Sequence, residues 1–220
     1  MPDLSLLAAA ARRLFPPGVA VAATNPRVFS AAFPGEELIN AVPARQSEFS
    51  AGRAAARAAM AELGLSPATI PSRPDRAPDW PKGCLGSITH SKSACLAAVT
   101  RVTTLRGIGL DLEPDTPLDP NLWPTICLVD ELNWLEKNEK SQQGQLALLI
   151  FSAKEAAYKC QYAISEQMFG FETLHVQIAQ NSQSFTATFR QSIGPFSKGT
   201  PLSGRYVQCE SHILTAVTIP

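Results

Sequence analysis

An apolar stretch that ends in two carboxylates, Gly107–Pro114, constrains the fold of this chain more than any other part of the sequence. Its pattern predicts a buried β-strand. Because residues i and i+2 of a strand point to the same side, Asp111 and Glu113 should lie about 7 Å apart on one face, with Leu112 packed behind them. Pro114 has no N–H to donate, so the strand ends there. Two converging carboxylates suit Mg²⁺, which takes one or two of them together with water and substrate phosphates. The alternative is a strand end with two solvated acids.

A second stretch, Phe151–Lys159, lies within the longest predicted helix, 143–163. Apolar residues recur along this helix at spacings of three and four, which indicates a stripe facing the core. The stripe consists of Leu146, Ile150, Ala153, Ala157 and Cys160. Glu155 and Lys159 are i,i+4 neighbours on an adjacent face. They are either a catalytic pair or an ordinary surface ion pair.

The composition is that of an ordinary soluble globular protein, with 45% hydrophobic residues, 17% charged residues and a formal net charge of zero. The neutral balance argues against extensive nucleic-acid binding. The five cysteines show no CxxC spacing, so we expect reduced core thiols and no zinc cluster. No signal peptide or membrane-spanning stretch is evident. We therefore expect a cytoplasmic protein of 220 residues, folded as one large domain or two small lobes.

Other segments predict a mixture of helices and strands. Helices are expected over 1–15, 45–63, 121–127 and 129–138, with Ser47 as the N-cap of the second and Gly64 just beyond its end. Strands are expected over 19–29, 85–91, 94–102 and 106–112, and the last two should form a hairpin or meander that delivers the carboxylates. Four further strands are expected over 173–179, 184–189, 204–210 and 212–219.

Basic residues gather in two places that precede the carboxylates. Arg53 and Arg57 are i,i+4 neighbours on an alanine-rich helix, whose small side chains allow another molecule to approach closely. The proline-rich loop 64–83 carries Arg73, Arg76 and Lys82, and Trp80 favours an ordered loop with a function. Next comes His90, set among the small hydroxyls of Ser87, Thr89 and Ser91, all of which can bind phosphate. The alternatives are solvated arginines and a structural histidine.

The chain also contains a short internal sequence repeat. Residues 93–100 and 211–218 agree at their Ser, Leu, Ala, Val and Thr positions. Two similar α/β lobes, each ending in the same hairpin strand, would leave such a trace.

Three blocks stand in one order: Gly-Ser-Ile-Thr-His-Ser, Gly-Leu-Asp-Leu-Glu and Phe-Ser-Ala-Lys-Glu-Ala-Ala-Tyr-Lys. Together they resemble the 4'-phosphopantetheinyl transferases of the larger, surfactin-synthetase-activating type. The Arg-x-x-Glu-Phe-x-x-Gly-Arg-x-x-Ala-Arg block at 45–57 and the Trp-Pro-x-Gly-x-x-Gly-Ser stretch at 80–87 fit the subgroup of enterobactin synthase component D. Phe151 departs from the tryptophan of many members, but both are packing residues.

The resemblance implies an α+β fold of two similar lobes related by a pseudo-twofold axis, each a small antiparallel sheet packed with a long helix. The N-terminal lobe would span 1–112 and the C-terminal lobe 113–220, with the active site between them. Such enzymes transfer the phosphopantetheine arm of coenzyme A to a serine of an apo carrier protein, acyl, peptidyl or aryl, and release adenosine 3',5'-bisphosphate. Siderophore, nonribosomal peptide or polyketide synthesis would supply the carrier, and a monomer would suffice.

The resemblance also implies a role for each site residue. Asp111, Glu113 and Glu155 would bind Mg²⁺, with Mn²⁺ as a substitute, and Glu155 would also take the proton of the serine, directly or through water. Lys159 would stabilise the leaving phosphate and Lys154 the transferred one. The coenzyme A phosphates would be held by Arg45, Arg53, Arg73, Arg76, Ser87, Thr89 and His90. Two other classes stay open: a Mg²⁺-dependent nucleotide pyrophosphate hydrolase and a non-catalytic module that binds coenzyme A or a carrier protein.

Overall fold

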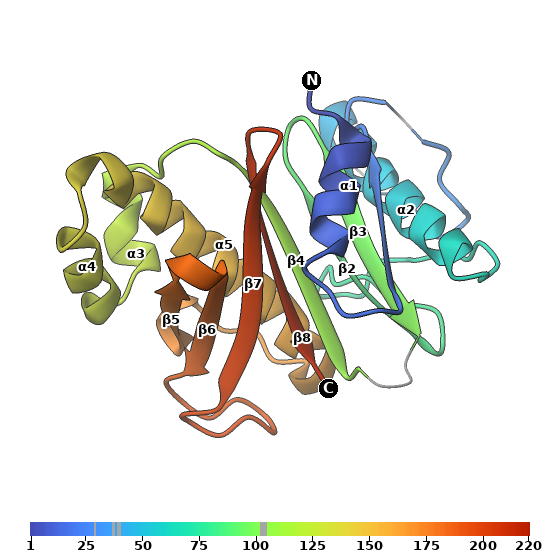
Figure 1. The fold of residues 1–220 in the computed structure, drawn as a ribbon. Coiled ribbons are helices and arrows are strands. Elements are labelled where there is room, and N and C mark those ends of the chain that lie inside the picture. The colour runs from blue at the N-terminus through green and yellow to red at the C-terminus, as the bar shows by residue number, and fades with distance from the viewer. Residues whose placement is uncertain (29, 37, 39–40, 102–104) are drawn as a thin grey trace.

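The computed structural model describes residues 1–220 except 29, 37, 39–40 and 102–104, and it contains two antiparallel sheets (Figure 1). The three-stranded sheet has the order β1-β3-β2, and the five-stranded sheet has the order β4-β8-β7-β6-β5. The strands of the first sheet are β1 (Val19–Thr24), β2 (Cys84–His90) and β3 (Cys95–Arg101). Those of the second are β4 (Gly107–Pro114), β5 (Leu174–Ala179), β6 (Ser184–Phe189), β7 (Pro201–Cys209) and β8 (His212–Ile219). This mixed α+β architecture confirms the expected fold class.

Helices cover both sheets (Figure 1). Helix α2 packs on the three-stranded sheet, α5 packs on β4 and β8, and α1 lies over β1 and reaches β7 and β8. The α-helices are α1 (Leu4–Arg12), α2 (Pro43–Glu62), α3 (Trp123–Ile126), α4 (Val129–Glu136) and α5 (Lys140–Ser165). Single 3-10 turns are η1 (Pro120–Leu122), η2 (Phe171–Thr173) and η3 (Gln180–Ser182). Among the described residues, no helix combines the length and the apolar character needed to cross a membrane.

Strand β1 is buried on both faces because it separates two cores. Val19 and Val21 pack in the core beneath α1, whereas Ala20 and Ala22 pack against α2. Strand β3 follows the same alternation, which is the two-residue period of a strand. Small residues dominate the side that faces α2, so this alanine-rich helix lies close to the sheet.

Strand β4 also presents two different faces. Ile108, Leu110 and Leu112 are buried in the core beneath α1. The opposite face carries Gly107, Gly109 and then Asp111, and it meets helix α5. A Cβ atom at Gly109 would lie 1.9 Å from the backbone oxygen of Ala156, a distance that no packing adjustment of side chains relieves. The glycines are therefore required by the close approach of α5 to the strand.

The expected pairing of β4 with β3 is wrong. Strand β4 pairs with β8 instead, with Asp111 opposite Thr215. It does run beside β2, but two hydroxyls bridge the strands in place of a backbone ladder. Ser87 Oγ accepts a hydrogen bond from Leu110 N at 3.0 Å, and Thr89 Oγ1 accepts one from Leu112 N at 3.2 Å. The two sheets are thus joined along the strand that carries the carboxylates.

The topology repeats itself. The segment β1, α2, β2 and β3 forms a sheet in which β3 lies between β1 and β2, and β4, α5, β7 and β8 form one in which β8 lies between β4 and β7. The similar segments 93–100 and 211–218 lie on β3 and β8, which hold the same place in the repeated topology. Strands β5 and β6 extend the second copy only.

Several boundaries differ from the sequence-based expectation; for example, α1 covers Leu4–Arg12 instead of 1–15 and α5 covers Lys140–Ser165 instead of 143–163. Helix α2 begins at Pro43 with Val42 at its N-cap, so Ser47 lies inside the helix and its assignment as the cap is wrong. Proline suits this first position because its missing N–H would be unpaired there in any case. Strand β1 ends at Thr24, before the turn at 26–28, and the predicted end at Phe29 lies outside the described residues.

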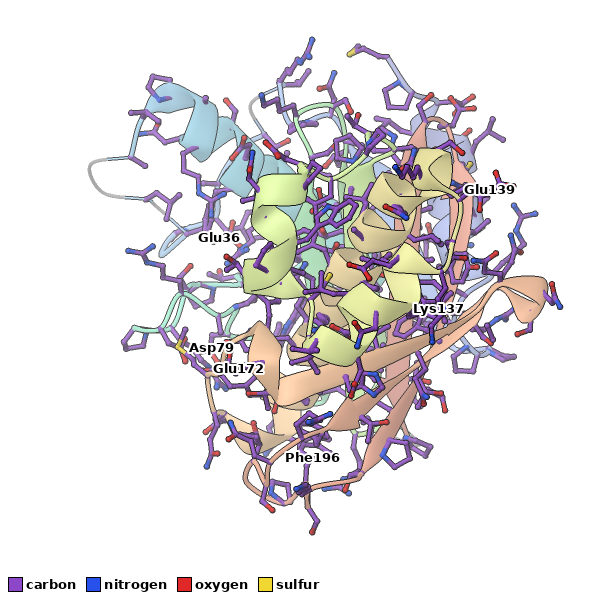
Figure 2. The ribbon with its side chains drawn as sticks, turned by 90° about the vertical axis from the view of Figure 1, so that its left-hand side faces the viewer. Glu36, Asp79, Lys137, Glu139, Glu172 and Phe196 are labelled. Carbon is purple, nitrogen blue, oxygen red and sulfur yellow. The ribbon has the colours of Figure 1, made fainter. Side chains whose placement is uncertain are left out.

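Helices α3 and α4 form an outer layer on α5, with Lys137 and Glu139 in the connection between α4 and α5 (Figure 2). Beneath this layer the ammonium of Lys154 is 1% exposed. It donates to Glu131 Oε2 at 2.7 Å, to the carbonyl of Ile126 at 2.8 Å and to that of Phe171 at 3.1 Å. All three donors are used. Lys154 therefore ties helix α5 to α3, α4 and η2.

We predict that Gly109→Ala destabilises the protein by about 3 kcal/mol, the upper end of what over-packing costs, because the new methyl meets the backbone of α5. Gly204→Ala is the comparison: its Cβ would meet only side-chain atoms, the outer ring atoms of Phe185, and we expect about 1 kcal/mol. Urea unfolding of both variants measures the difference. A loss of about 1 kcal/mol or less for Gly109→Ala would show that α5 can move away from β4.

We also predict that Lys154→Met costs about 3–5 kcal/mol, because the substitution leaves the Glu131 carboxylate buried without its cation. Arg190→Ala is the control, since Arg190 pairs with the neighbouring Asp130 at 3.6 Å on the surface and should contribute about 0–1 kcal/mol. Thermal and urea unfolding of the two variants test the contrast, and a Lys154 variant as stable as the wild type would contradict it.

Candidate active site

The carboxylate of Asp111 is the meeting point of three elements. On β4 itself it is 3% exposed, and it accepts hydrogen bonds from β2 and from α5. Thr89 donates to Oδ1 at 3.1 Å, Ser152 donates to Oδ2 at 2.8 Å, and Lys159 Nζ lies 2.6 Å from Oδ1. The strand therefore delivers Asp111 to helix α5, a contact that the spacing along the strand does not predict by itself.

Lys159 pairs with Asp111, so the alternative of an ordinary surface ion pair with Glu155 does not describe it. Burial works to lower the pKa of Lys159, but the negative charges of Asp111 and Glu155 outweigh it and raise that pKa. The ammonium therefore stays charged at neutral pH. Its side chain is 26% exposed, so it also reaches solvent.

Glu113 and Glu155 are half-buried next to this pair, and neither makes a side-chain hydrogen bond to another described residue. Burial and the charge of Asp111 raise the pKa of Glu113 to about 7, and burial likewise raises the pKa of Glu155. Three carboxylates face one ammonium, so the cluster holds an excess of negative charge that a hard divalent cation would offset. The donor set fits Mg²⁺. Across the described residues, however, no three His, Cys, Asp or Glu side chains stand as a ready-made metal site.

A cavity of about 480 Å³ opens beside the carboxylate cluster, between β2, the loop before it and the C-terminal half of α5. Trp80 forms part of its wall and covers Gly86, where a Cβ would lie 2.2 Å from the indole ring. Tyr158, Tyr162 and Lys159 line the opposite side. The volume falls within the range of small-molecule sites. Lys159 is the residue shared by this cavity and the carboxylate cluster.

Arg45 and His90 lie together at the edge of this region. The Arg45 guanidinium donates to His90 Nε2 at 2.9 Å and lies 3.3 Å from Glu48. Burial lowers the pKa of His90, the negative charge of Glu48 offsets part of that effect, and the positive charge of Arg45 lowers the pKa further. The imidazole is therefore neutral at neutral pH, with Nε2 as the acceptor.

Arg53 is buried beneath the proline-rich loop 64–83, called the basic loop because it carries Arg73, Arg76 and Lys82. It donates through Nε to the carbonyl of Ile70 at 2.9 Å and through Nη2 to Ser72 at 3.3 Å, and its guanidinium stacks on Phe49. Burial lowers its pKa to about 10, so it remains charged. Arg53 therefore fastens the start of the loop to α2, and Nη1 makes no hydrogen bond to any described residue.

Arg57 lies one turn further along α2 and serves the fold. It forms a buried ion pair with Glu36 at 2.7 Å and stacks on Phe33. The same carboxylate accepts a hydrogen bond from Ile70 N at 2.8 Å. This pair holds the segment before α2 and the loop after it on one helix.

Hydrogen bonds hold the basic loop against the C-terminal end of α5. Arg73 donates to Glu166 at 2.6 Å and to Asp79 at 3.4 Å, and Tyr162 donates to Asp75. The cation of Arg73 is thus already neutralised. Arg76 lines the cavity, and its side chain makes no hydrogen bond within the described part of the chain.

Three sequence-based assignments are contradicted by these contacts. Lys154 cannot stabilise the transferred phosphate while its three donors hold Ile126, Glu131 and Phe171. Ser87 and Thr89 were expected to bind phosphate, but they are 5% and 4% exposed and their hydroxyls hold β4. In each case the hydrogen-bonding groups of a chemically suitable side chain are already used within the fold.

The sequence-based search overlooked Ser152. This serine, Glu155 and Lys159 are spaced i, i+3 and i+7, which places them on one face of α5. That spacing is the signal that could have identified it.

Two family models match this chain. The model described as "4'-phosphopantetheinyl transferase N-terminal domain" matches residues 34–100, and the model described as "4'-phosphopantetheinyl transferase superfamily" matches residues 107–215. The matches include Arg45, Arg53 and His90 in the first and all three carboxylates in the second.

Curated relatives agree with the family models. The chain is 35% identical over 198 residues to 4'-phosphopantetheinyl transferase Npt of Nocardia iowensis, covering 84% of this chain and 88% of the relative. It is 32% identical over 193 residues to 4'-phosphopantetheinyl transferase Svp of Streptomyces mobaraensis, covering 85% and 78%. It is 38% identical over 128 residues to enterobactin synthase component D of Salmonella typhimurium, covering 56% and 51%. With family models over most of its length and such relatives, this chain belongs to the 4'-phosphopantetheinyl transferase superfamily.

Proposed function

We propose that this enzyme binds coenzyme A in the cavity of about 480 Å³ and transfers its phosphopantetheine arm at the adjoining carboxylate cluster. The observation that carries the proposal is the position of Lys159. Its ammonium lines the cavity and pairs with Asp111, so a pyrophosphate bound in the cavity would meet both a cation and a carboxylate cluster. Lys159 would stabilise the negative charge that develops on the leaving phosphate.

Mg²⁺ would be held by Asp111, Glu113 and Glu155, with Mn²⁺ as a substitute. When bound, the cation neutralises charge on the pyrophosphate. The support is the excess of negative charge among these side chains and the absence of any competing hydrogen bond at Glu113 and Glu155 within the described chain.

Glu155 is our candidate for the group that takes the proton of the carrier serine, directly or through water. It is half-buried, and its carboxylate makes no hydrogen bond to another described residue, so it can accept a proton from a hydroxyl bound beside it. It also lines a second cavity of about 100 Å³ with Phe169 and Phe171.

Arg45, Arg53 and His90 would bind the 3'-phosphate of coenzyme A. The neutral His90 and the unused Nη1 of Arg53 can each contribute a hydrogen bond, and the two guanidiniums supply the charge. Arg76 would add a cation from the loop, whereas Arg73 would have to exchange its carboxylate partners first.

We further propose that the chain is a monomer of the larger, surfactin-synthetase-activating type, acting on acyl, peptidyl or aryl carrier proteins of siderophore, nonribosomal peptide or polyketide synthesis. One chain supplies both sides of the Asp111 site, which supports a monomer. The boundary between its lobes would fall before Gly107 instead of after Leu112, because β4 pairs with β8. The five free cysteines support a reducing, cytoplasmic location.

The deciding experiment incubates the protein with coenzyme A, Mg²⁺ and an apo carrier protein, and then weighs the carrier by mass spectrometry. A gain equal to one phosphopantetheine, with release of adenosine 3',5'-bisphosphate, supports the proposal. Consumption of coenzyme A without a change in carrier mass would indicate a pyrophosphate hydrolase, and binding without turnover would indicate a binding module.

We predict that Lys159→Ala binds coenzyme A within a few-fold of the wild type but loses about two or more decades of kcat, because its charge matters most as the phosphate bond breaks. Lys137→Ala, at the surface between α4 and α5 (Figure 2), is the control and should leave both quantities unchanged. Single-turnover transfer and calorimetry measure them. A parallel loss of affinity and rate would assign Lys159 to ground-state binding.

We predict that Arg45→Ala weakens the binding of coenzyme A by about one to two decades, the equivalent of a lost charge-assisted contact, and the binding of dephospho-coenzyme A much less. Arg101→Ala, an exposed arginine at the end of β3, serves as the control. Isothermal calorimetry with both ligands measures the difference. Equal weakening for the two ligands would remove Arg45 from the 3'-phosphate site.

A further inference from the structure

The carboxylate of Asp111 is held from two sides by hydroxyl groups that the reaction itself does not use. We propose that Thr89 and Ser152 are positioning residues that orient Asp111 for the divalent cation. This inference rests on the proposed function, since it assumes that Asp111 binds the metal ion.

The two hydroxyls reach the carboxylate from different parts of the fold. Thr89, on β2, donates to Oδ1, and Ser152, on α5, donates to Oδ2. Each oxygen thus has its own neutral donor, so the carboxylate can neither flip nor turn about its side-chain bonds without breaking a buried hydrogen bond.

Ser152 is itself held in place by Thr215. It is fully buried, and Thr215 on β8 donates to its carbonyl oxygen at 2.8 Å and lies 2.9 Å from its hydroxyl. Because Thr215 donates its one hydroxyl proton to the carbonyl oxygen of Ser152, the Ser152 hydroxyl keeps its own proton for Asp111 Oδ2. The chain Thr215, Ser152, Asp111 therefore runs from β8, the strand next to β4 in the five-stranded sheet, through α5 to the site.

The number of hydrogen bonds that Asp111 can accept also supports its role as the one oriented ligand of the cluster. An ionised carboxylate has about four lone-pair sites. Thr89, Ser152 and Lys159 take three of them, which leaves one for a cation. Glu113 and Glu155 have no hydrogen bond to a described residue and can adapt. The cluster would thus offer one oriented ligand and two adjustable ones, and the oriented ligand lowers the entropy lost when the ion binds.

Ser87 provides a matched control for Thr89. Both hydroxyls lie on β2, both are buried, and both accept a hydrogen bond from the backbone of β4, but only Thr89 touches Asp111. Loss of either hydroxyl weakens the joint between the sheets. Only the loss of Thr89 releases the carboxylate.

The experiment titrates Mn²⁺ into the full-length protein with saturating coenzyme A and measures free Mn²⁺ by electron paramagnetic resonance. We expect Thr89→Val and Ser152→Ala to weaken Mn²⁺ binding by about 10-fold or more, the usual effect of losing a partner of a metal ligand. Thr89→Ser keeps the hydroxyl and should restore most of the affinity. Ser87→Ala should lower the melting temperature as Thr89→Val does while binding Mn²⁺ within about 3-fold of the wild type.

The outcomes separate this inference from the function on which it rests. If Thr89→Val and Ser152→Ala bind Mn²⁺ no more weakly than Ser87→Ala, the hydroxyls serve the fold alone and the inference is overturned. If the wild type binds no Mn²⁺, or Asp111→Ala binds it equally well, the proposed metal site fails and the inference fails with it.

Discussion

The close approach of helix α5 to strand β4 is the constraint on which the site depends. A helix normally packs on a sheet through side chains, but here Gly107 and Gly109 remove them, and the strand meets the backbone of Ala156 and Cys160. This contact brings the polar face of α5 within hydrogen-bonding reach of Asp111. Ser152 and Lys159 can bond to the same carboxylate only because the helix axis lies so near the strand.

Charge is then arranged around two lysines of α5 with opposite uses, one fully buried and one partly exposed. Lys154 is fully enclosed, and its partners satisfy every donor, so its charge stabilises one arrangement of α3, α4 and α5. Lys159, five residues later, has a strong partner in Asp111 but remains partly exposed to the cavity. The first lysine has no donor left for a ligand, whereas the second combines a fixed position with access to one. The enzyme family to which the chain belongs transfers a phosphopantetheinyl group, and the accessible lysine suits phosphoryl chemistry of that kind.

Sequence patterns predicted the elements well and their partners poorly. The alternation that ends in Asp111 and Glu113 identified both the strand and its polar face, because the two-residue period is local. The pairing of β4 with β8 depends on residues about a hundred positions away, and the expected hairpin with β3 was wrong. Ser47 likewise satisfied a local rule for a helix cap, but Pro43 begins the helix earlier. The similarity of residues 93–100 and 211–218 was the exception, since β3 and β8 hold the same place in the repeated topology.

The amino-acid sequence by itself determined the α+β class, the order of the family's blocks and the residue types from which a metal and phosphate site can be built. Only the tertiary structure decided which of those side chains are available. Lys154, Ser87, Thr89 and Arg53 look suitable for phosphate in sequence, yet burial has committed the hydrogen bonds of all but Arg53, which keeps one nitrogen. The physical reason is that a buried donor must find a partner within the fold, and which partner it finds depends on chain segments that meet only when the sheets are assembled.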